Sequence, residues 1–149
     1  MSLALLAALL APAPAAETPR AFVERLYAGY RDSDYSPLAR PGRVFAAPLV
    51  AAIREDQRLS RDEVGYMDAD PLCQCQDAGG LSPDIGEVRR LGRFRATVHV
   101  LLDFGGSDRR DLSLQLVRTA AGWRISDIVT AEEQSLLDSI RRFNRRRSR

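Results

Sequence analysis

The stretch FRATVHVLLDFGGSDRRDLSLQLVRTAAGWRISDI, residues 94–128, decides the fold of this chain. Apolar residues occupy alternate positions there, which is typical of strands that bury one face of a sheet. They are Phe94, Ala96, Val98, Val100, Leu102 and Phe104, then Leu112, Leu114 and Leu116, then Trp123 and Ile125. The segments 105–108 and 120–122 have the length and the glycine residues of hairpin connections. The stretch therefore predicts three antiparallel strands in a meander.

The segments before this stretch follow a helical period. Thr18-Pro19 is typical of a helix start, and the apolar residues that follow it predict a helix over 19–31. Phe45, Leu49 and Ile53 lie four residues apart and predict a second helix, with Pro48 near its start or at a kink. We also expect a short strand at 87–91, immediately before the meander.

The end of the chain predicts a closing helix. Thr130 and Glu133 have the form of a capping box, in which each residue satisfies a backbone group of the other. Apolar residues continue the helical spacing at Leu136, Leu137, Ile140 and Phe143. We therefore predict an α+β fold: a curved antiparallel sheet of three to four strands, packed against N-terminal helices and followed by a C-terminal helix.

Length and charge indicate a single domain with a basic end. The chain has 149 residues, 45% of them hydrophobic, which is enough for one core. Six of the 22 arginines lie in residues 141–149, where there is no acidic residue. Residues 1–140 therefore hold 16 arginines and 20 acidic residues, a balance of −4. We expect one domain over 17–143 and an arginine-rich tail over 144–149.

Residues 1–16, MSLALLAALLAPAPAA, have the pattern of a signal peptide. The apolar run is too short for a transmembrane helix, and small residues end it at Ala16, where a signal peptidase would cut. No Lys or Arg precedes the run, and no cysteine follows it that could carry a lipid anchor. We expect a periplasmic or secreted protein whose mature chain has no transmembrane segment. The alternative is a cytoplasmic protein with an apolar N-terminal helix, which Pro12 and Pro14 would break.

Residues 64–84 have turn-forming residues throughout and predict a long ordered loop, which is uncommon inside a compact domain and often functional. Its cysteines, Cys73 and Cys75, are the only two in the chain. In an exported protein they would pair as a disulfide that fastens the loop. The alternatives are a redox-active pair, favoured by the strain of so small a ring, or free thiols and metal ligands.

The same loop offers the side chains of a metal or binding site. Its other polar members are Asp68, Asp70, Gln76 and Asp77. Their spacing, with or without the cysteines, fits neither the usual zinc pattern nor the calcium loop. Short acidic residues beside a proline more often cap turns. We predict a binding or structural loop that holds no metal, and the sequence indicates no cofactor.

Two further residues are candidates for catalysis. His99 is the single histidine of the chain, on the strand face opposite Val98 and Val100, where it could act as a general base paired with Asp103. The alternative is an exposed strand histidine without a chemical role. Asp127 follows Trp123 and Ile125 on the predicted inner face, where a buried carboxylate needs partners or a wet cavity. A bulge near Ser126 would instead turn it outward.

The arginine-rich tail has two interpretations. It could bind anionic lipid or an acidic partner, whereas we expect no nucleic acid to be bound by an exported protein. The alternative is a solvated helix end, where arginines are favourably placed at the negative pole of the helix dipole.

Several features together resemble the bacterial domain of unknown function 3828 family. They are the leader, the tyrosine-rich first helix, the loop from Asp70 to Asp77, the meander, the ending Gly122-Trp-Arg-Ile-Ser-Asp-Ile128 and the final helix. The resemblance implies a nuclear-transport-factor-2-like, or cystatin-like, fold, in which a curved sheet wraps helices into a cone. It implies no catalytic residue, because the molecular function of that family is not established.

Three functions follow as expectations. The first is a non-enzymatic binding or interaction module of the bacterial cell envelope, whose partner is an envelope protein or a small ligand. The second is an isomerase or dehydratase, since the implied fold hosts such enzymes, with Asp127 and the pair Tyr27 and Tyr30 lining the cone. The third is an exported immunity-type protein that neutralises a toxin.

Overall fold

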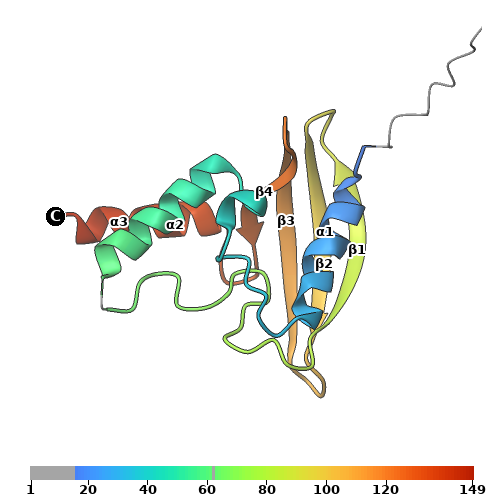
Figure 1. The fold of residues 1–149 in the computed structure, drawn as a ribbon, viewed down its shortest axis with the longest axis horizontal. Coiled ribbons are helices and arrows are strands. Elements are labelled where there is room, and N and C mark those ends of the chain that lie inside the picture. Colours follow the sequence, from blue (N-terminus) through green and yellow to red (C-terminus); the bar gives the residue numbers. More distant parts are fainter. Residues whose placement is uncertain (1–15, 62) are drawn as a thin grey trace, which may run out of the picture.

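The computed structural model describes residues 16–61 and 63–149, and its centre is a four-stranded antiparallel sheet in the order β1-β2-β3-β4 (Figure 1). The strands are β1 (Ser82–Arg90), β2 (Arg95–Asp103), β3 (Arg109–Thr119) and β4 (Gly122–Val129). The predicted α+β fold with a meander is confirmed. The leader predicted at 1–16 falls almost wholly outside the described residues.

Three α-helices complete the fold: α1 (Pro19–Ala28), α2 (Ala47–Ser60) and α3 (Leu136–Arg147). Two 3-10 turns, η1 (Gly29–Arg31) and η2 (Pro41–Arg43), follow α1 and precede α2. Helix α1 lies across β1 and β2, whereas α2 and α3 pack side by side beyond β4 (Figure 1). None of the described helices is long and apolar enough to cross a membrane.

The core lies between the inner face of the sheet and the helices. Alternation places Val98, Val100, Leu112 and Leu114 in the core with no exposed surface. In β4 the spacing changes, because a bulge opposite Gln115 and Leu116 puts Ile125 and then Ile128 on the inner face. The open edge of β4 is covered in part by a parallel bridge between Phe45 and Ile125.

Several sequence expectations need correction. Phe94 precedes β2 and is 57% exposed, although its position in the alternation predicted an inward side chain. Strand β1 begins at Ser82, five residues before the expected strand, because Pro83 is tolerated on an edge strand.

The expected cap of the last helix also differs. Thr130 accepts a hydrogen bond from the Glu133 amide, but this bond closes a turn and does not start the helix. The residue that caps α3 is Ser135, whose hydroxyl accepts from the Asp138 amide.

Helix α3 continues four residues past the boundary expected at 143, into the segment expected to be a tail. Asn144 is buried, and its side-chain amide donates to the Ala52 carbonyl at 3.0 Å. Arg147 pairs with Glu63 and donates to the Val64 carbonyl. Residues 144–147 therefore pack α3 against α2 and the segment that follows it.

Candidate functional site

The candidate site is the loop between α2 and β1, and its first part is held by a buried carboxylate. Asp56 in α2 is 1% exposed, and its two oxygens accept from the backbone amides of Tyr66 and Met67, both at 2.9 Å. Gly65 makes this approach possible, because a Cβ there would lie 2.6 Å from an Asp56 oxygen and 2.5 Å from the Ser60 hydroxyl. Asp56 thus fixes where the loop leaves the helix.

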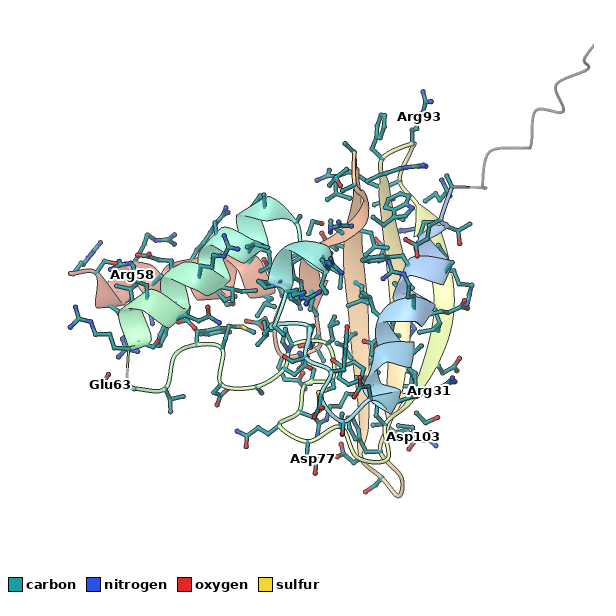
Figure 2. All side chains as sticks on the ribbon, viewed as in Figure 1. Arg31, Arg58, Glu63, Asp77, Arg93 and Asp103 are labelled. Atoms are coloured by element: carbon teal, nitrogen blue, oxygen red, sulfur yellow. A yellow bond between two sulfur atoms is a disulfide. The ribbon has the colours of Figure 1, made fainter. Side chains whose placement is uncertain are left out.

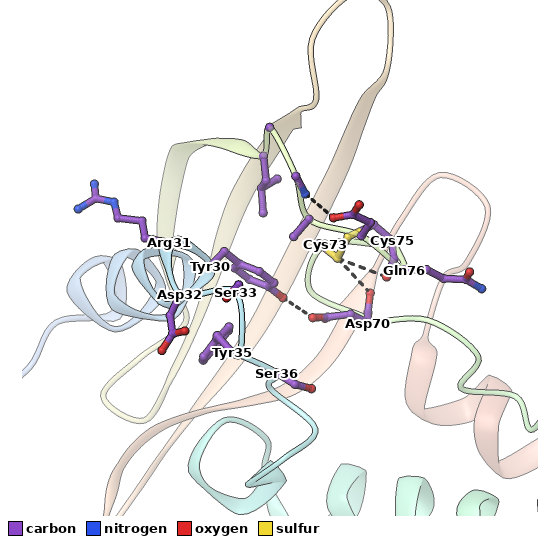
Figure 3. Close-up of a pocket in the computed structure, with 15 residues that line it drawn as sticks. Tyr30, Arg31, Asp32, Ser33, Tyr35, Ser36, Asp70, Cys73, Cys75 and Gln76 are labelled. Carbon is purple, nitrogen blue, oxygen red and sulfur yellow. Dashed lines mark hydrogen bonds between the residues drawn. A yellow bond between two sulfur atoms is a disulfide. The ribbon is translucent and has the colours of Figure 1, made fainter.

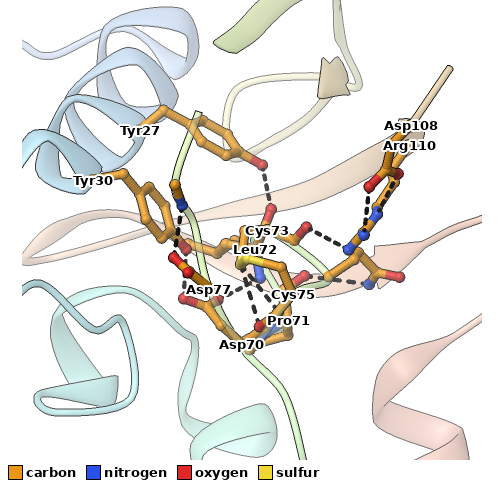
Figure 4. Close-up of a disulfide and its surroundings, with 12 residues drawn as sticks. Tyr27, Tyr30, Asp70, Pro71, Leu72, Cys73, Cys75, Asp77, Asp108 and Arg110 are labelled. Atoms are coloured by element: carbon orange, nitrogen blue, oxygen red, sulfur yellow. Dashed lines mark hydrogen bonds and ion pairs between the residues drawn. A yellow bond between two sulfur atoms is a disulfide. The ribbon is translucent and has the colours of Figure 1, made fainter. Parts of the chain in front are cut away.

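The middle of the loop is a closed turn that contains the disulfide. Cys73 and Cys75 are bonded, and the Asp70 amide donates to the Cys75 carbonyl at 3.0 Å (Figure 4). Between the cysteines, Gln74 adopts a positive φ of 56°. The pairing predicted for the two cysteines is therefore present in the structure, and it closes a very small ring.

Tyrosines from α1 and η1 attach this turn to the rest of the domain. Tyr27 donates its hydroxyl hydrogen bond to the Leu72 carbonyl at 2.8 Å, and Tyr30 donates to an Asp70 oxygen at 2.7 Å (Figure 4). The other Asp70 oxygen accepts from the Leu72 amide at 2.8 Å. From β3, Arg110 donates to the Cys73 carbonyl. The turn is therefore fastened from a helix on one side and from the sheet on the other.

A polar pocket of about 610 Å³ opens beside this turn (Figure 3). Its walls come from the segment after α1 and from the loop, and include Tyr30, Tyr35, Asp70 and the disulfide. The Tyr30 and Tyr35 rings meet edge to face with centroids 4.9 Å apart. The Tyr35 hydroxyl is buried and has no hydrogen-bond partner within the described part of the chain.

Burial controls the protonation of this cluster. It raises the pKa of Asp70 above its ordinary value, although hydrogen bonds from Tyr30 and from the backbone act in the opposite direction. Burial, followed by the charge of Asp70, raises the pKa of Tyr30 far above the ordinary range of a tyrosine. The Tyr30 hydroxyl is thus a stable hydrogen-bond donor rather than an acid.

The raised pKa of Asp70 predicts a pH effect on stability. Between the ordinary pKa of 3.8 and the higher folded value, the unfolded chain loses the proton first, so ionisation of Asp70 costs stability as the pH rises. The variant Asp70→Asn keeps an acceptor for the Leu72 amide and does not titrate. In urea unfolding, the unfolding free energy of the variant should therefore rise relative to that of the wild type between pH 4 and 7. A constant difference over this range would contradict the raised pKa.

A second prediction concerns the disulfide. The cysteines are two residues apart, and closing so short a loop removes little entropy from the unfolded chain. Reduction should therefore cost only about 1.5 kcal/mol of unfolding free energy. The chain has no other cysteine, so urea unfolding with and without a phosphine reductant measures this bond alone. A loss of more than roughly 3 kcal/mol would mean that the bond, not the Tyr27 and Tyr30 contacts, holds the loop.

The remaining predicted loop residues lie on the outer surface of the loop. Asp68, Gln76 and Asp77 are exposed, and an Asp77 oxygen accepts from the Gly79 amide at 2.8 Å, which forms a turn. Within residues 16–61 and 63–149 there is no group of three or more His, Cys, Asp or Glu side chains that could hold a metal ion.

The two predicted catalytic candidates lie away from the loop turn. His99 is on the outer face of β2, 2.6 Å from an oxygen of Asp111 in β3. Asp103, the partner considered for a general-base pair, contacts Arg109 instead, so His99 and Asp103 do not pair and His99 lies on the outer surface of its strand. Asp111 lies diagonally across the strand pair, a contact that follows from the β2–β3 register and not from spacing within one strand.

Asp127 lies at the β4 bulge, half-buried, where it fixes the start of α3. One oxygen accepts from the amides of Ile128 and Leu137, and the other accepts from the Ser135 hydroxyl at 2.6 Å. Both oxygens of Asp127 are therefore hydrogen-bonded at the positive end of the α3 dipole, where a carboxylate is favourable. This geometry agrees with the alternative in which a bulge turns the side chain away from the core.

Sequence reasoning missed Asp56 and Arg110. Asp56 did leave a signal, because it continues the buried stripe of α2 after Leu49 and Ile53, where a charged side chain needs buried partners. Arg110 left none, since its contact with the Cys73 carbonyl joins residues 37 positions apart.

Fold and site together define a small α+β domain that presents a rigid, polar loop. No protein-family model matches the chain, and no curated protein matches it significantly. The resemblance to the domain of unknown function 3828 family therefore has no support from a family model, although the small α+β fold that it implied is present.

Solved structures do share the fold. A chain of the type VI effector–immunity complex Tae3–Tai3 from Ralstonia pickettii superposes with a TM-score of 0.57 at 22% identity, covering 76% of this chain and 95% of that one. The selenomethionine form of that complex gives a TM-score of 0.55, 23% identity, and 76% and 97% coverage. A protein of unknown function from Bacteroides thetaiotaomicron gives 0.41, 22%, and 72% and 85%. The first two values show a common fold.

Proposed function

We propose that this chain is an immunity-type protein: a non-enzymatic module that binds a toxic effector and blocks it. The proposal is carried by the fold shared with a chain of an effector–immunity complex over nearly the whole length of that chain. Immunity by binding needs a stable surface and no catalytic residues, and the loop between α2 and β1 is such a surface.

The positions of the reactive side chains support binding over catalysis. The single histidine of the chain lies on the exposed face of the sheet with Asp111, and both cysteines are in the disulfide. The two oxygens of Asp127 are engaged at the start of α3. In the pocket beside the disulfide, the oxygens of Asp70 are engaged by the Tyr30 hydroxyl and the Leu72 amide, which hold the loop in place.

The loop has the properties of a contact surface. Asp56, Tyr27, Tyr30 and the disulfide hold its backbone, so little conformational entropy is lost when a partner binds. Its outward side chains include Asp68, Gln76 and Asp77, and residues 1–140 carry a net charge of −4. We infer that the partner presents a basic surface to this loop.

The proposal places the protein outside the cytoplasm. The leader pattern of residues 1–16 supports export, and a disulfide is most stable in an oxidising compartment. Fractionation of the native cells, with an antibody against the domain and mass measurement of the N-terminus, tests this part. Recovery of the protein in the cytoplasm with residues 1–16 attached would contradict it.

The test of function begins with capture of the partner from native cells by the tagged full chain. The captured protein is then expressed with an export signal in a bacterial host. Alone it should stop growth, and co-expression of this chain should restore growth. A captured protein that is harmless, or toxicity that persists although the two proteins bind, would contradict the immunity function.

Matched variants test the surface. Asp68→Arg with Gln76→Arg changes two exposed loop side chains and should abolish protection. Glu87→Arg with Gln115→Arg makes the same change of charge on exposed positions of the sheet and should leave protection intact. Equal loss in both pairs would mean that the loop is not the contact surface, while the immunity function itself would stand.

A further inference from the structure

We propose that the tip of the β1–β2 hairpin binds the surface of an anionic membrane. The tip is the segment Arg89-Arg-Leu-Gly-Arg-Phe-Arg95, which joins the two strands at one end of the sheet. It lies apart from the loop and from the C-terminal arginines, and Figure 2 shows Arg93 at the extremity of the molecule.

The tip exposes two large apolar side chains close together in the sequence. Leu91 is 51% and Phe94 57% exposed, and they are two of the three large hydrophobic side chains exposed among the described residues. Gly92 turns the chain between them with a φ of 89°, and the Leu91 amide donates to the Arg95 carbonyl at 2.9 Å. The hairpin therefore presents both side chains on a fixed backbone.

Arginines surround these apolar side chains. Arg89, Arg90, Arg93 and Arg95 belong to the tip, and Arg118 lies beside it in β3, where its amide donates to the Phe94 carbonyl. None of the five forms an ion pair with a described residue. Their charges are thus available to an anionic partner.

Local packing keeps several of these guanidinium groups in place. Arg90 and Arg118 each lie 5.9 Å from the centroid of the Trp123 ring, and Arg93 lies 5.7 Å from that of Phe94. Stacked guanidinium groups retain hydrogen-bond donors that fit phosphate oxygens. Exposed aromatic and aliphatic side chains ringed by arginines suit the boundary between lipid headgroups and acyl chains.

The exposed apolar side chains favour a membrane over an acidic protein as the partner, because an acidic protein surface would satisfy the arginines but offer Leu91 and Phe94 no apolar contact. The Trp123 indole donates to the Glu17 carbonyl at 3.0 Å, so the chain enters the domain beside Arg90 and Arg118.

The experiment measures binding of the mature chain, which begins at Glu17 after the predicted cleavage, to vesicles by sedimentation. Phosphatidylcholine vesicles with added phosphatidylglycerol should bind the chain, whereas pure phosphatidylcholine should bind it weakly, and high salt should release it. The variant R89Q/R93Q/R95Q removes three exposed charges without touching Arg90. At about fivefold for each arginine, it should weaken binding roughly 100-fold. The variant L91S/F94S keeps the charges and should also weaken binding, because it removes the apolar contacts.

The matched control removes the same charge from the other end of the molecule. R141Q/R145Q/R146Q changes three exposed arginines of α3 and should bind vesicles as the wild type does. Circular dichroism checks that every variant is folded. The proposal is overturned if the hairpin variants bind vesicles like the wild type, or if only the α3 variant loses binding. It is also overturned if the wild type does not bind vesicles but binds an acidic protein that the hairpin variants fail to bind.

Discussion

Replacing Trp123 by alanine should remove a large part of the stability of the domain. The ring is 1% exposed in the core and lies beneath two arginines, and its indole nitrogen donates to the Glu17 carbonyl. Truncating a buried tryptophan costs about 3–5 kcal/mol, because the transfer energy is lost and a cavity remains. A domain of this size has about 5–15 kcal/mol in total, so the variant should be partly unfolded near physiological temperature.

Urea unfolding at 25 °C followed by far-ultraviolet circular dichroism measures this effect. The variant Trp123→Phe separates its two causes, since phenylalanine fills most of the space but cannot donate to Glu17. It should lose about 1–2 kcal/mol, from the hydrogen bond and from the smaller ring. A loss of unfolding free energy below about 1 kcal/mol in the alanine variant would contradict the central place of Trp123 in the core.

The second large effect is expected from Asp56→Ala. This change leaves the half-buried amides of Tyr66 and Met67 without their acceptor, and it detaches the loop from α2. Hydrogen bonds to a charged group and buried donors left unpaired each contribute, so we expect a loss of about 2–4 kcal/mol in unfolding free energy. Under the proposed immunity function, protection against the captured toxin should fall as well, because the loop would no longer be held in position.

Two variants of the same helix serve as comparisons. Asp56→Asn keeps one acceptor but turns an N–H group towards the second amide, so it should recover only part of the loss. Glu55→Ala removes the neighbouring acid, whose contact is an exposed pair with Arg58, and should change stability little. Hydrogen exchange at residues 63–70 adds a local measurement. Unchanged protection there in Asp56→Ala would show that the loop is held by its other contacts alone.

The loop illustrates how far residue patterns reach. The sequence indicated that residues 64–84 form an ordered loop and that Cys73 would pair with Cys75, because only two cysteines exist. It did not indicate that Tyr30 would meet Asp70, 40 residues away, or that Asp56 would hold the loop start. These contacts depend on how α1 and α2 are oriented against the sheet, which no local pattern records.

Periodicity and the turn residues determined β2, β3 and β4, their meander order and the three helices, since alternate or helical burial of apolar side chains is a local property of the chain. Strand β1 was expected only in its second half. Tertiary structure decided the partners of the polar side chains. His99 pairs with Asp111 through the strand register, and the bulge in β4 sends Asp127 to the start of α3. Asn144, expected in a tail, is buried against Ala52. The physical reason is that burying apolar area needs no specific neighbour, whereas a hydrogen bond requires one particular atom at about 3 Å.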